Sequence, residues 1–137
     1  MTDVIAVDTS VAIPLVVSTH RAHNAVVKWW NGQPLALSGY ALIETYSVLT
    51  RLPGDVRLTA ADAATLLAER FADPLMLPTA DAARLPELLA DHGIAGGAAY
   101  DAIVGMAALR NGCVLATRDA RATGTYQAIG ARIEIVT

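Results

Sequence analysis

The segment VIAVDTSV, residues 4–11, joins a short apolar run to an acidic residue and two hydroxyl residues. The run from Val4 to Val7 predicts a buried β-strand. Ser10 is placed to cap a following helix, which we expect to reach about Val17. A buried strand that leads into a helix is typical of a domain that alternates strands and helices around a parallel sheet.

The rest of the chain repeats this alternation of short apolar runs and longer helical stretches. Four more strands are predicted, at residues 34–38, 75–77, 113–116 and 132–136. Further helices are predicted at residues 20–30, 40–52, 59–71, 79–92, 98–111 and 123–129. The pattern predicts an α/β fold, a three-layer sandwich in which helices flank a mainly parallel five-stranded sheet.

Composition limits the class of protein. With 137 residues, of which 54% are hydrophobic and 17% charged, we expect one domain over residues 1–137. Cys113 is the only cysteine, which excludes an internal disulfide and a cysteine-rich zinc site and favours a reducing compartment. No apolar stretch approaches a membrane span, and no basic region precedes the first apolar run as in a secretory signal. We therefore expect a cytoplasmic protein with no membrane contact.

The charge balance constrains any contact with nucleic acid. The net charge is −3, so such contact needs a local basic patch or bound cations. The candidates for phosphate contacts are Arg51, Arg57, Arg118 and Arg121. Lys28 is the only lysine and precedes Trp29, which excludes a P-loop NTPase because its Gly-Lys-Ser/Thr motif is missing.

Four acidic residues are candidates for chemistry: Asp8, Glu44, Asp101 and Asp119. Asp8 and Asp119 follow predicted strands, and ligands of open α/β sheets bind outside the carboxyl ends of the strands. Glu44 and Asp101 lie in predicted helices among apolar residues. A buried carboxylate is costly unless a cation, a hydrogen-bond donor or water accompanies it.

Each acid also has a purely structural explanation. Asp8 can cap the helix that follows it, and Asp101 lies early in its helix, where a carboxylate favours the dipole. The other two acids can instead pair with nearby arginines: Arg118 or Arg121 for Asp119, and Arg51 for Glu44. Acids that converge at one end of a sheet repel one another, however, and need a hard cation such as Mg²⁺ or Mn²⁺.

Four motifs occur in order along nearly the whole chain: VIAVDTSV at 4–11, YALIE at 40–44, YDA at 100–102, and LATRD at 115–119 with Thr125, Tyr126 and Gly130 after it. Together they resemble the PIN-domain ribonucleases and, within them, the VapC toxins of bacterial toxin–antitoxin pairs. The resemblance implies a PIN-like fold and a metal-dependent endoribonuclease. It further implies RNA as the substrate, a VapB-like antitoxin that occupies the site with a C-terminal segment, and a homodimer.

The resemblance also assigns roles within the motifs. It makes Asp8 and Asp101 direct ligands of Mg²⁺ or Mn²⁺, and makes Asp119 and Glu44 further ligands or water-mediated supports. Ser10 and Thr117 are then expected to hydrogen-bond around them. Many relatives carry another acid soon after the aspartate of the fourth motif, whereas this chain has Ala120 and Arg121 after Asp119. Whether the site holds a second metal strongly is therefore an open question.

Two other functions remain as alternatives. One is a degenerate PIN module that binds RNA or protein without catalysis, although the presence of all four acids argues against it. The other is a metal-free ribonuclease in which His20 and His23, one helical turn apart, act as acid and base. Trp29 and Trp30 point to opposite sides of one predicted helix, so one of them is free for an oligomer surface.

Overall fold

Strand β1, Ile5–Val7, lies inside a parallel sheet in the computed structural model, which describes residues 3–137. The other strands of this sheet are β2, Leu35–Leu37, β3, Leu115–Thr117, and β4, Ile133–Ile135. Their order is β2-β1-β3-β4, and each neighbouring pair is parallel. The predicted α/β class and the parallel sheet are therefore confirmed.

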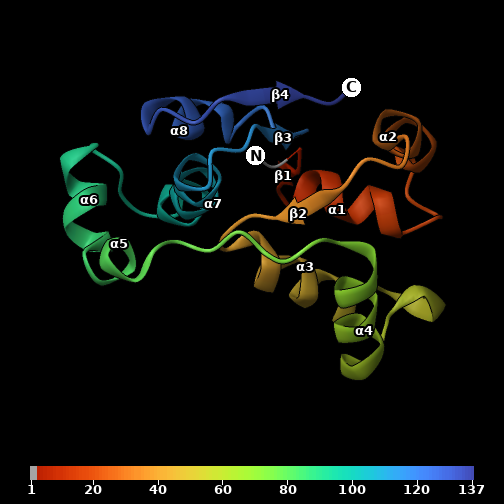
Figure 1. Ribbon diagram of the computed structural model, residues 1–137. Helices are drawn as coiled ribbons and strands as arrows, with labels where there is room; N and C mark the ends of the chain where they lie inside the picture. Colours follow the sequence, from red (N-terminus) through yellow and green to blue (C-terminus); the bar gives the residue numbers. More distant parts are fainter. Residues whose placement is uncertain (1–2) are drawn as a thin grey trace.

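Helices flank the strands (Figure 1). Their bounds are α1 Thr9–Val16, α2 His23–Trp30, α3 Ala41–Thr50, α4 Ala60–Arg70, α5 Thr79–Ala83, α6 Leu85–Asp91, α7 Ala98–Arg110 and α8 Thr123–Ala128, with a 3₁₀ turn at Gly54–Val56. Helices α1 and α2 pack together on one side of the strands, and α7 and α8 pack together on the other. Helices α3 and α4 form a further pair that extends below the sheet in Figure 1. Within residues 3–137, no helix is both long and apolar enough to cross a membrane.

The prediction of a fifth strand at residues 75–77 is wrong, because the sheet has four strands within residues 3–137. Leu75 makes only an isolated parallel bridge with Ser38. Pro74 and Pro78 flank this segment, and proline lacks the N–H group that would extend a ladder. The segment is thus held beside β2 at a single point.

The predicted helix at residues 79–92 is divided into α5 and α6 at Arg84. Pro86 lies in the first turn of α6. A proline inside a continuous helix removes one hydrogen bond and collides with the carbonyl group four residues earlier, so the chain restarts its helix here. The other predicted helices and strands are confirmed to within three residues at either end.

Strands β1, β2 and β3 are almost completely buried. Ala6, Val7, Leu35, Leu37 and Leu115 are each at most 2% exposed, as expected for a parallel sheet covered by helices on both faces. All four strands run in the same direction, so their carboxyl ends meet at one edge of the sheet. The residues that follow these ends are therefore brought together.

The turn between β2 and α3 fixes helix α3 against α7. The Ser38 hydroxyl donates to the Val104 carbonyl at 2.7 Å. Gly39 has φ +54°, and a Cβ placed there would lie 2.7 Å from the Ile103 carbonyl oxygen. Only glycine tolerates both this backbone conformation and this close approach. The turn therefore sets the spacing between the helix that carries Glu44 and the helix that carries Asp101.

We expect Gly39→Ala to lower the free energy of unfolding by about 2–4 kcal/mol, because it adds a clash with α7 to the cost of a positive φ. Gly32→Ala is the matched control. Gly32 also has a positive φ, +78°, but a Cβ there would meet nothing within 4 Å, so its loss is about 1 kcal/mol. Urea unfolding measures both values, and equal losses would contradict the close approach at Gly39.

Candidate active site

The carboxyl ends of β1 and β3 form the switch point of the sheet. The chain leaves β1 towards β2 on one side, while β3 lies on the other side of β1. Ligands of such sheets bind in the crevice at this point. Asp8 directly follows β1, and Asp119 lies two residues after the end of β3.

A pocket of about 280 Å³ opens here and brings the four predicted acids together. It is lined by Asp8, Thr9, Ser10, Ile13, Glu44, Val48, Asp101, Val104, Asp119 and Tyr126. We call it the acid pocket. The convergence expected from the topology is thus confirmed, although two of the acids come from helices whose spacing no sequence motif specifies.

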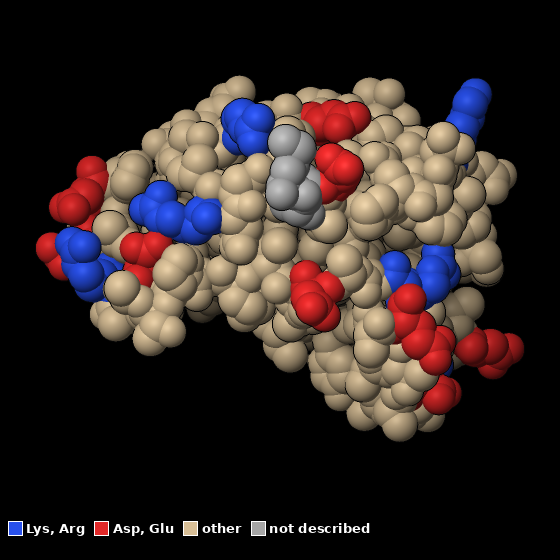
Figure 2. Space-filling model, in the orientation of Figure 1, with Lys and Arg blue, Asp and Glu red and all other residues tan. Residues whose placement is uncertain are grey.

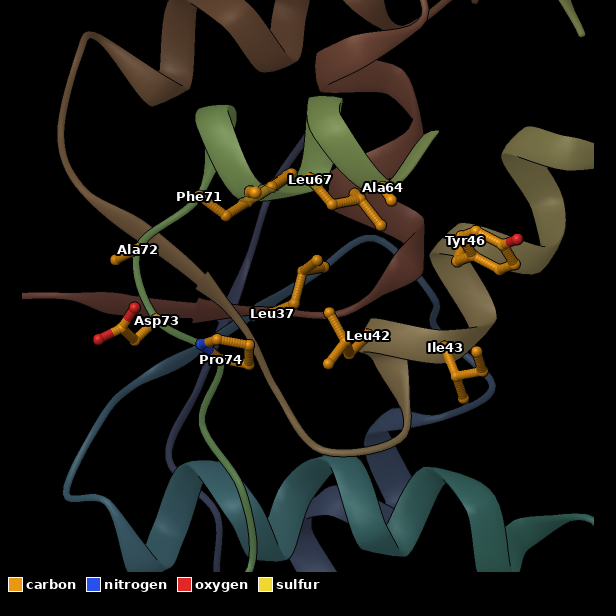
Figure 3. Close-up of a pocket in the computed structure, with 11 residues that line it drawn as sticks. Leu37, Leu42, Ile43, Tyr46, Ala64, Leu67, Phe71, Ala72, Asp73 and Pro74 are labelled. Carbon is orange, nitrogen blue, oxygen red and sulfur yellow. The ribbon is translucent and has the colours of Figure 1, made fainter. Parts of the chain in front are cut away.

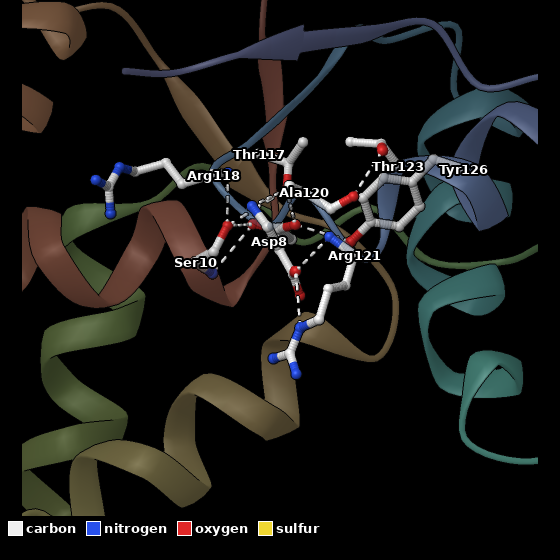
Figure 4. A network of polar contacts seen from close by, with 9 residues as sticks. Asp8, Ser10, Thr117, Arg118, Ala120, Arg121, Thr123 and Tyr126 are labelled. Atoms are coloured by element: carbon white, nitrogen blue, oxygen red, sulfur yellow. Dashed lines mark hydrogen bonds and ion pairs between the residues drawn. The ribbon is translucent and has the colours of Figure 1, made fainter.

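Asp8 is the most buried of these acids, with 4% of its surface exposed. Its Oδ1 accepts hydrogen bonds from the Ser10 N–H at 3.0 Å and the Ser10 hydroxyl at 2.5 Å. Its Oδ2 accepts from the Thr117 hydroxyl at 2.5 Å and the Tyr126 hydroxyl at 2.8 Å (Figure 4). Asp8 is also the N-cap of α1, so the capping role that its motif predicts is confirmed, and the same carboxylate lines the acid pocket.

The two hydroxyl residues that hold Asp8 also hold the loop after β3. The Ser10 hydroxyl oxygen accepts from the Arg118 N–H at 2.7 Å, and the Thr117 hydroxyl oxygen accepts from the Asp119 N–H at 3.0 Å. The expectation that Ser10 and Thr117 hydrogen-bond around the acids is therefore confirmed. These contacts fix where Asp119 leaves the sheet.

Glu44 is held by a threonine rather than by an arginine. Its Oε1 accepts from the Thr9 hydroxyl at 2.6 Å, and the Thr45 hydroxyl donates to Thr9 Oγ1 at 3.3 Å. The alternative pairing with Arg51 is wrong, since that guanidinium donates to the Ser47 hydroxyl. Glu44 is thus tied to α1, directly beside Asp8.

Asp119 both pairs with an arginine and lines the acid pocket. Its Oδ1 accepts from the Arg121 N–H at 3.0 Å and lies 3.9 Å from Arg121 Nε. The Arg121 side chain is 97% exposed, so solvent screens this ion pair and leaves it weak. The carboxylate still lines the acid pocket.

The pKa of Asp101 is raised by burial and by the charges of the other acids. The residue lies in the first turn of α7 and is half-buried. Burial raises the pKa of its carboxyl group most, and the charges of Asp119, Glu44 and Asp8 raise it further, against a smaller lowering by Arg121. The acids are therefore close enough to interact electrostatically.

The donor set of the acid pocket fits a hard cation. Carboxylate oxygens are the ligands that Mg²⁺ and Mn²⁺ prefer, and the charges of Asp119, Glu44 and Asp8 add to the effect of burial in raising the pKa of Asp101. A bound cation would offset this repulsion between the acids. Within residues 3–137, however, no three His, Cys, Asp or Glu side chains already form a group that could hold a metal ion. The four hydrogen bonds on Asp8 occupy the roughly four acceptor positions of a carboxylate, so ligation requires one donor to turn away.

Two polar residues of the acid pocket, Thr9 and Tyr126, escaped the sequence-based prediction of the site. Thr9 was visible only as the middle residue of Asp-Thr-Ser. The signal for Tyr126 was weaker still, because a buried tyrosine needs a partner for its hydroxyl but the sequence does not say which. Burial and the contact with Asp8 raise the pKa of Tyr126 well above its ordinary value, so the hydroxyl stays protonated and donates.

The histidine pair lies outside the acid pocket. His20 Nδ1 accepts from the Ala22 N–H at 3.0 Å, and His23 Nδ1 lies 2.7 Å from the Pro14 carbonyl oxygen. Burial and the nearby Arg118 lower the pKa of His20. Both rings are engaged with backbone groups, which favours a structural role for them over acid–base chemistry.

The sequence of this chain is similar to those of known proteins. The PIN domain family profile matches residues 5–126. The chain is 58% identical over 131 residues to ribonuclease VapC27 of Mycobacterium tuberculosis, covering 96% of each chain. It is 40% identical over 134 residues to ribonuclease VapC40 of the same species, covering 97% of this chain and 99% of that one.

Solved structures share the fold at low sequence identity. VapC20 of M. tuberculosis, described as a toxin that cleaves the sarcin–ricin loop, superposes with a TM-score of 0.67 at 22% identity, covering 93% of this chain and 95% of that one. VapBC2 of Rickettsia felis, bound to a DNA fragment from its promoter, superposes with a TM-score of 0.64 at 12% identity, covering 96% and 98%. These two likenesses concern the fold alone. The family profile and the VapC relatives show that the chain belongs to the PIN domain family and, within it, to the VapC ribonucleases.

Proposed function

We propose that this protein is a metal-dependent endoribonuclease, the toxin of a toxin–antitoxin pair, that hydrolyses RNA phosphodiester bonds with water. The observation that carries the proposal is the acid pocket, in which four carboxylates meet at the switch point of the sheet. The VapC relatives carry the name ribonuclease, which supports RNA as the substrate. No other group of strong acids or bases lines this pocket.

In the mechanism that we propose, Asp8 and Asp101 hold a Mg²⁺ or Mn²⁺ ion, and Glu44 and Asp119 hold it directly or through water. When bound, such an ion lowers the pKa of a coordinated water and neutralises charge that develops on the phosphate. Asp8 contributes a carboxylate whose orientation is fixed by hydrogen bonds on both oxygens. Thr9 keeps the Glu44 carboxylate turned towards α1.

Arginines beside the pocket are suited to hold the RNA backbone. Arg118 and Arg121 are exposed and follow β3 at the pocket edge, where guanidinium groups can contact phosphates and fix the register of the strand. On the face that Figure 2 shows, basic side chains lie singly or in small groups among acidic ones. Because the net charge is also −3, we infer that bound cations supply much of the attraction for RNA. Arg51 and Arg57 instead bond to Ser47 and to the Leu52 carbonyl.

We further propose a small VapB-like antitoxin as the partner, which occupies the acid pocket with a C-terminal segment. The fold likeness to VapBC2 and the membership in the VapC ribonucleases support this partner. The cytoplasm is the compartment where such an enzyme meets its RNA, and the buried free thiol of Cys113 is compatible with it.

We assign the proposed homodimer to an apolar face around Ile43. The tryptophans are unsuited to this role, because both are partly buried and their indole N–H groups donate to Glu134 and to the Gln33 carbonyl. Ile43 and Met76 are 54% and 55% exposed and line one apolar hollow. Ile43 also lines a second hollow, of about 410 Å³, between α3 and α4 (Figure 3). Exposed apolar surface of this kind marks an interface.

We expect the protein to sediment as a dimer at micromolar concentration and Ile43→Asp to sediment as a monomer, because the substitution puts a charge at the centre of this face. Val56→Asp is the control, since Val56 is also exposed, at 38%, but lies in the 3₁₀ turn away from both hollows. Analytical ultracentrifugation measures the mass. A wild-type monomer would remove the dimer from the proposal.

The alternative of a degenerate module that binds RNA or protein without catalysis predicts no cleavage. We expect the purified protein, freed of any partner, to cleave RNA with Mg²⁺ or Mn²⁺ and to stop in excess EDTA, because the pocket holds acids and no other strong catalyst. Asp8→Asn, prepared in parallel, detects contaminating ribonuclease. Undiminished cleavage in EDTA would rule out the metal mechanism, and no cleavage under any condition would favour the binding module.

Asp101→Asn separates a metal ligand from a structural acid. Because the folded pKa of Asp101 is raised above its ordinary value of 3.8, the folded state binds this proton more tightly than the unfolded state. Stability of the metal-free protein therefore falls as the pH rises above that value. We expect Asp101→Asn to flatten this dependence and to keep or raise the Tm in EDTA at neutral pH.

In Mg²⁺ the same variant should lose most of the metal-induced rise in Tm, which depends on the ligand concentration relative to Kd, together with cleavage. Scanning calorimetry with and without Mg²⁺ measures both effects. A purely structural acid in the first turn of α7 would lose only its interaction with the helix dipole, about 0.3–1 kcal/mol, and would leave the Mg²⁺-induced rise in Tm and the cleavage unchanged. A normal Mg²⁺ shift with normal cleavage would move Asp101 out of the metal site.

A further inference from the structure

Tyr126 joins helix α8 to the acid at the end of β1. The residue is 1% exposed, and its hydroxyl donates to Asp8 Oδ2 at 2.8 Å (Figure 4). Within residues 3–137 this is the only hydrogen bond that the hydroxyl makes. The contact spans 118 positions of the sequence and ties α8 to the end of β1.

The position of the Tyr126 ring depends on Gly105 in α7. A Cβ on Gly105 would lie 3.1 Å from Tyr126 Cδ1 and 2.6 Å from Ile129 Cδ1. Real Cβ atoms essentially never approach a neighbour as closely as the 2.6 Å to Ile129, and the 3.1 Å to Tyr126 is tighter than most contacts, so the absence of a side chain at Gly105 lets α8 approach α7. Gly105 lies one turn after Asp101 on the same helix. One close packing contact thus seats both the helix that carries Asp101 and the ring that holds Asp8.

Of the three hydroxyls on Asp8, that of Tyr126 has the least freedom to leave. Ser10 Oγ and Thr117 Oγ1 lie 3.3 Å apart, and either can donate to the other. One of these two can therefore turn its proton away and free an acceptor position on Asp8. Tyr126 has no second acceptor among the described residues, and a buried hydroxyl without a partner costs free energy, so it stays on Asp8.

We propose that Tyr126 is a positioning residue, whose hydroxyl holds the Asp8 carboxylate in the orientation that ligates the cation, and that Gly105 provides the space for its ring. The inference rests on the proposed function, because it concerns the metal that the acid pocket would bind. Groups that hydrogen-bond to ligating carboxylates orient them and tune their affinity for the metal. Tyr126 itself contacts Asp8 and is not expected to contact RNA.

The test is Tyr126→Phe, which removes the hydroxyl and keeps the ring. Isothermal calorimetry with Mg²⁺, in the absence of RNA, should show binding weaker by about tenfold or more. In the cleavage assay kcat should fall by about tenfold or more, while KM for RNA changes by less than about twofold because the contacts to RNA are intact. Thr50→Val is the control, since it also removes one hydroxyl, which donates to the carbonyl oxygens of Tyr46 and Ser47. Thr50 lines neither the acid pocket nor the two hollows beside Ile43, so this variant should bind Mg²⁺ like the wild type.

Gly105→Ala tests the same contact from the other side. It keeps the Tyr126 hydroxyl but displaces the ring, so it should weaken Mg²⁺ binding in the same direction. In the double variant Gly105→Ala with Tyr126→Phe, the fold-loss of Mg²⁺ affinity should be measurably smaller than the product of the two single fold-losses. The reason is that both changes act through one contact. If Gly105→Ala does not fold, Tyr126→Phe with its control decides alone.

Wild-type Mg²⁺ affinity and wild-type kcat in Tyr126→Phe would overturn the assignment, even if its Tm falls, because a purely structural hydroxyl changes stability and nothing else. Failure of the proposed function looks different. In that case the wild-type protein itself neither binds Mg²⁺ nor cleaves RNA, and the assignment falls with it. A loss confined to Tyr126→Phe, beside an active wild type and an unaffected Thr50→Val, supports the assignment.

Discussion

Burial of one negative charge at the end of β1 is the constraint on which this structure depends. Asp8 is 4% exposed and lies in a protein interior where an unpartnered carboxylate would ionise only at high cost. Its partners come from the first turn of α1, from the end of β3 and from α8. The charge is therefore stabilised only when distant segments have assembled, and the assembled state presents the carboxylate to the acid pocket.

The two acids on helices reach the pocket because glycines allow helices to approach closely. Gly39 lets the start of α3 rest on α7, and Gly105 lets α8 rest on α7. These contacts bring Glu44 and Asp101 to the edge of the sheet where Asp8 and Asp119 follow their strands, and there burial and the charges of the other three acids raise the pKa of Asp101. Repulsion of this kind opposes folding without a cation and is relieved by one, so the arrangement couples stability to ligand binding.

Much of the site followed from local sequence. Asp8 comes directly after an apolar run and Asp119 follows another after Thr117 and Arg118, and parallel topology brings such ends together. Glu44 and Asp101 are conspicuous as acids among apolar residues. Contacts between distant segments did not follow, because the choice of Thr9 over Arg51 as partner of Glu44, and of Asp8 as partner of Tyr126, depends on packing. In the fold, apolar character alone predicts a strand at residues 75–77 and one helix at 79–92. The flanking prolines limit the first segment to an isolated bridge, and Pro86 divides the second into two helices.

The most direct test of the central claim, that the four carboxylates form one cation site, is anomalous X-ray diffraction from crystals grown with Mn²⁺. The account predicts an anomalous peak inside the acid pocket, with oxygens of Asp8 and Asp101 as ligands and the Tyr126 hydroxyl still on Asp8. An empty acid pocket at saturating Mn²⁺, or a peak bound only by residues outside it, would contradict the account.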